Sequence, residues 1–320
     1  MTSRSRTLLL AGLASLAPAL AHASCGAAFC TVNSNWTAES AQAEAVNAYD
    51  VRFEYMDQDQ PYSGTRRLYV GEIPSHHDEV STVNRNLVAS YSHNFGSGLG
   101  VTVSAAVGAR EHVHIHNHHG ARINETWDFT RLGDVRVVGR YQLLGVADPL
   151  QPSSAGVTFG LKLPTGQTDV ANAAGSVAER SMQPGSGTTD LLLGAYYHRK
   201  LTAQDASWFV QGQYQGALAE HDHYRPGRQC NLDVGLRKGV GANLGLLAQL
   251  NFLHKASDRG SEAEPASSGG RFVFLSPGVS YALPHDMQLY AFYQHPLYRK
   301  VTGVQLTAPQ SFVLGVSGRL

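Results

Sequence analysis

Apolar and polar residues alternate along the segment from residue 101 to residue 118. One face of the segment is apolar and carries Val101, Val103, Ala105, Val107, Val113 and Ile115. The other face is polar and carries Thr102, Ser104, Arg110, His112, His114, His116 and His118. Successive side chains of a β-strand point to opposite faces, so the pattern predicts a strand with one apolar and one polar face.

Similar alternation recurs along the chain, for example over residues 49–55, 87–95 and 244–252. The connections between such segments are alternately short and long, and the periodicity gives about 12 strands. Outer-membrane barrels have an even number of strands, short periplasmic turns and longer outer loops. The chain is therefore predicted to be an all-β, membrane-spanning antiparallel β-barrel in the outer membrane of a Gram-negative bacterium. A soluble sandwich, with one face of each sheet buried against a second sheet, is the alternative.

The N-terminal residues have the pattern of a secretory signal. Arg4 and Arg6 precede an apolar stretch over residues 8–20, and Ala21-His22-Ala23 places small residues at a cleavage site. The apolar stretch is shorter than the roughly 20 residues that a transmembrane helix needs. We therefore expect residues 1–23 to be a signal peptide.

Two further units follow from this assignment. Residues 24–46 are expected to form an N-terminal periplasmic segment, and residues 47–320 the barrel. Cys25 and Cys30 lie close together in a chain predicted to be secreted, which favours a local disulfide, with a thiol metal site as the alternative. Lipidation of Cys25 is a further alternative, although His22 replaces the Leu-like residue of a lipoprotein signal.

Composition supports the membrane prediction only weakly. Charged residues make up 16% of the chain, below the share of about 25% in ordinary globular domains. Removal of Arg4 and Arg6 with the signal leaves 23 basic against 25 acidic residues, so no basic excess indicates a nucleic-acid partner. The expected partners are outer-membrane lipid and a small solute or metal ion.

Two glycine-rich segments carry a recognisable pattern. They are Gly160-Leu161-Lys162-Leu163-Pro164-Thr165-Gly166 and Pro184-Gly185-Ser186-Gly187-Thr188-Thr189-Asp190-Leu191-Leu192-Leu193-Gly194. The pattern resembles the outer-membrane protein family associated with meta-pathway phenol degradation. This resemblance implies a transporter-like barrel that passes small hydrophobic or aromatic compounds, and it supplies no catalytic residues. The histidine tracts lie outside the resembling segments.

Histidine is frequent, with 15 residues, and most of it gathers in three clusters. If the N-terminus is periplasmic, all three fall at the outer mouth. They are His76-His77-Asp78-Glu79, the segment from Glu111 to His119, and His221-Asp222-His223.

Spacing makes these clusters candidate metal ligands. Residues two apart on a strand are separated by about 6.6 Å along one face, so two imidazoles can tilt onto one ion. Imidazole with carboxylate suits zinc, copper or nickel. The predicted site has His112, His114 and His116 as its core, with His118, His76, His77, Asp78, His221 and His223 as further candidates. A solvated histidine-rich loop and a pH-sensitive gate are the alternatives.

The predicted polar interior also carries Asp50, Arg52, Glu54, Asp134, Arg136, Arg140, Asp233 and Arg237. These charges are expected to pair inside the lumen, with a selectivity ring as the alternative. Catalysis is not expected, because the sequence contains no nucleophile elbow, Walker loop or haem-attachment motif. The histidine run resembles a metallohydrolase loop but lacks the Asp expected before its final histidine.

Overall fold

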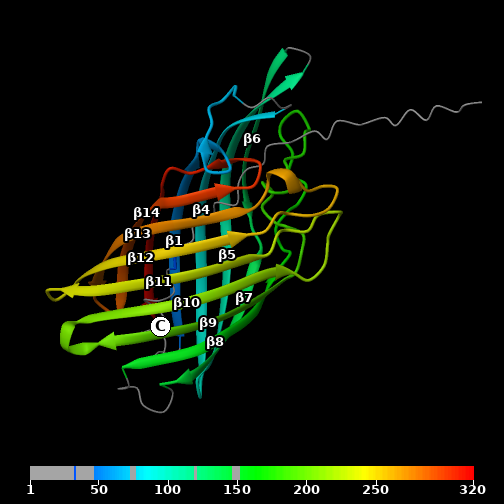
Figure 1. Cartoon of the computed structure of the whole chain (residues 1–320). Helices are drawn as coiled ribbons and strands as arrows, with labels where there is room; N and C mark the ends of the chain where they lie inside the picture. The colour runs from blue at the N-terminus through cyan, green and yellow to red at the C-terminus, as the bar shows by residue number, and fades with distance from the viewer. Residues whose placement is uncertain (1–31, 34–46, 73–76, 119–120, 146–151) are drawn as a thin grey trace, which may run out of the picture.

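The computed structural model describes residues 32–33, 47–72, 77–118, 121–145 and 152–320, and over these the chain is all-β. Twelve antiparallel strands form one closed barrel (Figure 1). They are β1 (Asn47–Gln58), β4 (His77–Gly96), β5 (Leu99–His118), β7 (Val135–Leu144), β8 (Ser153–Leu163), β9 (Asp190–Leu201), β10 (Ala206–Ala217), β11 (Gln229–Val240), β12 (Leu244–Lys255), β13 (Gly270–Leu283), β14 (Met287–Val301) and β16 (Ser311–Arg319). The predicted fold class is confirmed.

The barrel closes by pairing its first and last strands. β1 pairs with β16, from Ala48 opposite Arg319 to Met56 opposite Ser311, and its other edge pairs with β4. Since β4 also pairs with β5, the sheet returns to its starting point. A closed sheet has no second sheet to pack against, so the soluble-sandwich alternative is wrong.

Side chains along the wall follow the alternation seen in the sequence. In β12, Gln249 and Asn251 are buried inside, whereas Leu250 and Phe252 are 38% exposed on the outer surface. The exposed apolar side chains form the lipid-facing belt of an outer-membrane barrel. Within the described residues, no helix is long and apolar enough to cross a membrane. The helical turns are η1 (Thr202–Gln204) and η2 (Pro265–Ser267).

Several inward charges pair, as expected. Arg52 donates to Asp50 at 3.1 Å and to Glu54 at 2.8 Å, and Tyr290 donates to Asp50 at 2.6 Å. The guanidinium of Arg52 thus offsets part of the carboxylate charge inside the barrel. Val32 packs against the apolar cluster of Phe209, Leu247, Tyr290, Phe292 and Val313.

Asn33 binds the lumenal wall beside Val32. Its backbone N–H donates to the side chain of Gln249 at 3.1 Å, and the Gln249 amide donates back to its carbonyl at 2.8 Å. The predicted signal peptide, Cys25 and Cys30 lie outside the described residues. Cys230 is exposed with a free thiol.

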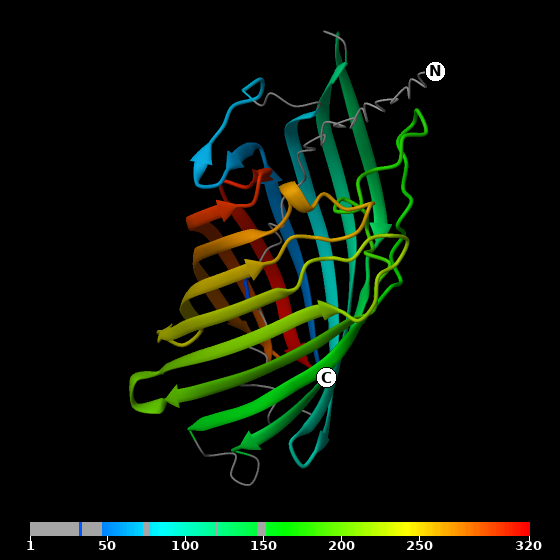
Figure 2. The same ribbon diagram turned by 45° about the vertical axis from the view of Figure 1, so that its right-hand side comes forward.

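The β4 and β5 strands extend far beyond the rest of the barrel (Figure 2). Each has 20 residues, about twice the length that a tilted strand needs to cross the membrane. The inner half of β5 pairs with β7, and its outer half pairs with an additional strand, β6 (Ala121–Leu132). The alternation in the sequence did not predict β6, and the connection expected in this region is in fact a strand. We call the outer halves of β4 and β5 together with β6 the flap.

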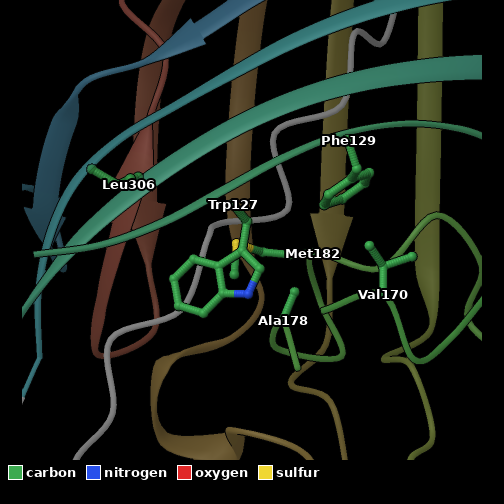
Figure 3. Close-up of a cluster of buried hydrophobic side chains, with 6 residues drawn as sticks. All are labelled: Trp127, Phe129, Val170, Ala178, Met182 and Leu306. Atoms are coloured by element: carbon green, nitrogen blue, oxygen red, sulfur yellow. The ribbon is translucent and has the colours of Figure 1, made fainter. Parts of the chain in front are cut away.

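The long β8–β9 loop, residues 164–189, is folded against the flap. Its Val170, Ala178 and Met182 form a buried apolar cluster with Trp127 and Phe129 of β6 and Leu306 (Figure 3). Leu306 belongs to β15 (Val304–Thr307), which forms a small sheet with β2 (Gln60–Ser63) and β3 (Arg66–Arg67). The loop therefore joins two separate parts of the outer mouth.

Candidate functional site

Three buried side chains converge within the flap. Glu79 of β4 and His112 and His114 of β5 are 0%, 1% and 3% exposed, and one ligand atom of each lies within 4.8 Å of the others. The Nε2 atom of His112 lies 3.6 Å from Oε2 of Glu79 and 3.3 Å from Nδ1 of His114. Ligands of a tetrahedral ion at bond lengths of about 2.0–2.1 Å are about 3.3 Å apart. The spacing of these atoms therefore fits a bound metal ion.

The second ring nitrogen of each histidine has its own partner. Nδ1 of His112 lies 2.8 Å from the hydroxyl oxygen of Thr82, and Nε2 of His114 lies 3.0 Å from Oε2 of Glu125. Metal-binding histidines characteristically engage the other ring nitrogen with such a group, which fixes the tautomer and the ring orientation. Both rings thus keep one nitrogen facing Glu79, where an ion would bind.

A bulge in β4 explains why Glu79 takes part. Thr82 pairs opposite His112, but the register shifts between Glu79 and Ser81, so Glu79 rather than Val80 lies opposite His114. A bulge adds one residue to a strand and reverses which side chains face inward beyond it. Glu79 was not among the predicted ligands, because strict alternation does not reveal a bulge.

Trp127 covers the two imidazole rings. Its ring centroid lies 4.8 Å from that of His114 and 5.6 Å from that of His112. The indole Nε1–H donates to the carbonyl oxygen of Ser176 in the β8–β9 loop at 2.9 Å. The candidate site is therefore buried, and Trp127 links it directly to the folded loop. The solvated-loop alternative does not describe His112 and His114.

The remaining predicted ligands are placed differently. His76 lies outside the described residues, and for His77, His116 and His118 the structure describes only the backbone, in β4 and β5. The Asp78 carboxylate accepts a hydrogen bond from the Gly71 N–H and lies 3.6 Å from Arg122, away from the imidazoles.

His221 and His223 form a separate group. They lie in the β10–β11 connection, with side chains 47% and 77% exposed, and their acidic neighbours are Asp222 at 3.0 Å and Glu220 at 3.8 Å. The structure therefore brings together His112 and His114 from the predicted set and leaves the His221–Asp222–His223 cluster apart.

Further acidic side chains lie next to the candidate site. Glu179 of the β8–β9 loop interacts electrostatically with Glu79 and is hydrogen-bonded to Glu264 in the β12–β13 connection. Burial raises the pKa of Glu179 well above its ordinary value, and the charges of Glu79 and Glu264 raise it further. Burial also raises the pKa of Glu264 to about 7.

These features define an outer-membrane β-barrel protein whose β8–β9 loop packs against the flap and against β15. The chain belongs to the family described as the putative MetA-pathway of phenol degradation, whose model matches residues 89–306. The resemblance seen in the sequence is thereby confirmed. No curated protein sequence matches the chain.

Solved structures are similar to this fold. An outer membrane channel from Pseudomonas putida F1 superposes with a TM-score of 0.61 at 12% identity, covering 86% of this chain and 95% of that chain. The NanC porin gives a TM-score of 0.46 at 11% identity, over 85% and 100% of the two chains. A Pseudomonas aeruginosa FadL homologue gives 0.44 at 11% identity, over 87% and 92%. At these identities the similarity concerns the fold alone.

Proposed function

We propose that the protein is an outer-membrane channel for small hydrophobic or aromatic solutes, and that its outer mouth binds a transition metal ion. The family and the barrel fold support a channel. The observation that carries the solute class is an aromatic niche on the lumenal wall. Phe272 and Phe274 stack there with ring centroids 6.0 Å apart, next to Met56, Pro296 and Ala308.

Polar groups border the niche. Gln294, Arg299 and Thr307 line it together with the aromatic rings, and Arg299 donates to the Thr307 hydroxyl at 2.9 Å. An apolar surface with a few hydrogen-bonding groups suits a small aromatic compound that carries a hydroxyl. The niche has room for about one water molecule in this conformation. Binding of a solute in the niche therefore requires its lining side chains to move.

Solute flux into proteoliposomes tests the channel. Phenol entry should exceed that of a sugar of similar size, and a Phe272→Ala, Phe274→Ala variant should reduce this preference. The matched control is Phe252→Ala, Phe312→Ala, which removes two lipid-facing rings. Absence of flux for every solute would favour the other class of function, a non-transporting module that binds metal or a partner.

The metal-binding part of the proposal rests on Glu79, His112 and His114. Two imidazoles and a carboxylate suit zinc, copper or nickel, and the second ring nitrogens are already engaged. Calorimetric titration of the metal-free protein with zinc should show one site that a His112→Ala, His114→Ala variant weakens by about 100-fold or more. A His221→Ala, His223→Ala variant should bind as the wild type does. Equal affinity in all three proteins would refute the site.

A further inference from the structure

Glu179 belongs to the β8–β9 loop and lies next to the candidate metal site. Its carboxyl group interacts electrostatically with Glu79 and is hydrogen-bonded to Glu264, and no Lys or Arg is among the groups that shift its pKa. Its Oε2 atom is buried and has no hydrogen-bond partner within the described part of the chain. A buried carboxylate oxygen in this state is costly unless a proton or a cation neutralises it.

The position of Glu179 in the loop is tightly fixed. Its carbonyl oxygen accepts the Met182 N–H at 2.9 Å, and the flanking side chains of Ala178 and Met182 are 3% and 0% exposed. Both belong to the cluster that packs on Trp127 (Figure 3). Movement of Glu179 away from the site therefore requires the loop to leave the flap.

We propose that Glu179 supplies the fourth ligand to the metal ion held by Glu79, His112 and His114, so that the ion fastens the β8–β9 loop to the flap and holds the mouth closed. This inference rests on the proposed metal site. Its structural basis is the juxtaposition of a rigid three-ligand group on one hairpin with an unpartnered carboxylate oxygen on the loop.

Geometry and charge agree with this assignment. Glu79 and the two histidines come from the paired strands β4 and β5, so three ligands are present without the loop. A tetrahedral ion needs one more ligand, and two carboxylates balance the charge of a divalent ion. The Glu179 carboxylate lies outside the group of atoms within 4.8 Å of one another, so its side chain must rotate toward the ion on binding.

Limited trypsin digestion of the full-length protein in detergent tests the fastening. Arg180 is half-buried in the docked loop, where it donates to the Thr168 and Ser186 carbonyl oxygens at 3.2 Å and lies over the Tyr224 ring. Undocking exposes the bond after Arg180 to trypsin. Zinc should slow cleavage at this bond by about 10-fold relative to chelator, a coupling of ordinary size. Mass spectrometry identifies the bond.

A Glu179→Gln variant distinguishes zinc binding from fastening of the loop. It should still bind zinc through Glu79, His112 and His114, but zinc should no longer protect Arg180. Glu262→Gln, an exposed acid of the β12–β13 connection, is the matched control and should behave as the wild type.

The outcomes are distinguishable. Zinc binding to the wild type without protection of Arg180 overturns the fastening and leaves the metal site intact. Equal protection of Glu179→Gln and the wild type overturns the role of Glu179. No calorimetric binding of zinc by the wild type refutes the metal site itself. If Glu179→Gln does not fold, protection of the wild type with and without zinc, compared with His112→Ala, His114→Ala, decides whether the ion fastens the loop.

Discussion

Buried carboxylates have different surroundings at the base of the β8–β9 loop and near its tip. At the base of the loop, Lys162 lies 2.7 Å from Asp134 and 3.4 Å from Asp190, and also donates to the Thr188 carbonyl oxygen at 3.1 Å. At the tip, Glu179 meets Glu79 and Glu264, with no ammonium or guanidinium among the groups that shift its pKa.

This difference separates a structural cluster from a candidate binding site. The base satisfies its charges with a cation from the chain itself, as the Arg52 group does in the lumen. The tip has an excess of negative charge that protons or a metal ion must neutralise. We therefore expect the stability of the barrel to depend on Lys162 at the base. We expect the docking of the tip to depend on pH and on metal binding.

Removal of the cation at the base should have the largest effect. Lys162→Met removes the ammonium group that pairs with the buried carboxylates of Asp134 and Asp190, which costs about 3–5 kcal/mol. Thermal unfolding in detergent, followed by heat-modifiable gel mobility, should show a lower midpoint. Lys238→Met at an exposed position is the control, and equal midpoints for the two variants would contradict the structural role of the base.

Loss of the indole should loosen the tip. Trp127→Ala removes a side chain that is 4% exposed and packs against the loop, so the docked state should lose about 3 kcal/mol. Trypsin cleavage after Arg180 should accelerate by about 100-fold in the presence of chelator. Trp208→Ala, which removes a ring on the outer surface of the barrel, should leave the rate unchanged.

The pH dependence of the stability should come from Glu264, next to the tip of the β8–β9 loop. Because the pKa of Glu264 in the folded protein is raised from 4.5 to about 7, the folded state binds more protons than the unfolded state between these values. The stability of the metal-free protein should therefore be full below the lower value and decline as pH rises through about 7. Glu264→Gln should flatten this decline in a series of unfolding midpoints, and an unchanged slope would contradict the assignment of the decline to Glu264.

An exposed pair should show the smallest effect. Arg85 and Glu111 form an ion pair on the outer side of β4 and β5, with side chains 39% and 50% exposed. Solvent screens such a pair, so Arg85→Ala should cost at most about 1 kcal/mol. A loss comparable to that of Lys162→Met would mean that exposure does not distinguish these clusters.

The strands of the barrel wall could be predicted from the sequence, but the structure of the mouth could not. Strands that face lipid on one side and the lumen on the other must alternate, as Leu250 and Asn251 do, so their number could be predicted. The strand β6 turns the apolar side chains of Trp127 and Phe129 inward, which breaks the rule of a polar interior, so the sequence pattern did not predict it.

The candidate site was predictable only in part. The positions of His112 and His114 on one inward face followed from their spacing. Glu79 required a bulge, and Glu125 and Glu179 come from β6 and from the β8–β9 loop. Contacts between segments so far apart in the chain depend on loop packing, which period-two patterns do not encode.

Zinc K-edge X-ray absorption on the loaded, full-length protein tests the metal site most directly. The account predicts two imidazole nitrogens and carboxylate oxygens at about 2.0–2.1 Å, with the imidazole scattering lost in His112→Ala, His114→Ala and retained in His221→Ala, His223→Ala. A shell of oxygen ligands without imidazole scattering, or the same spectrum in the His112→Ala, His114→Ala variant, would contradict it.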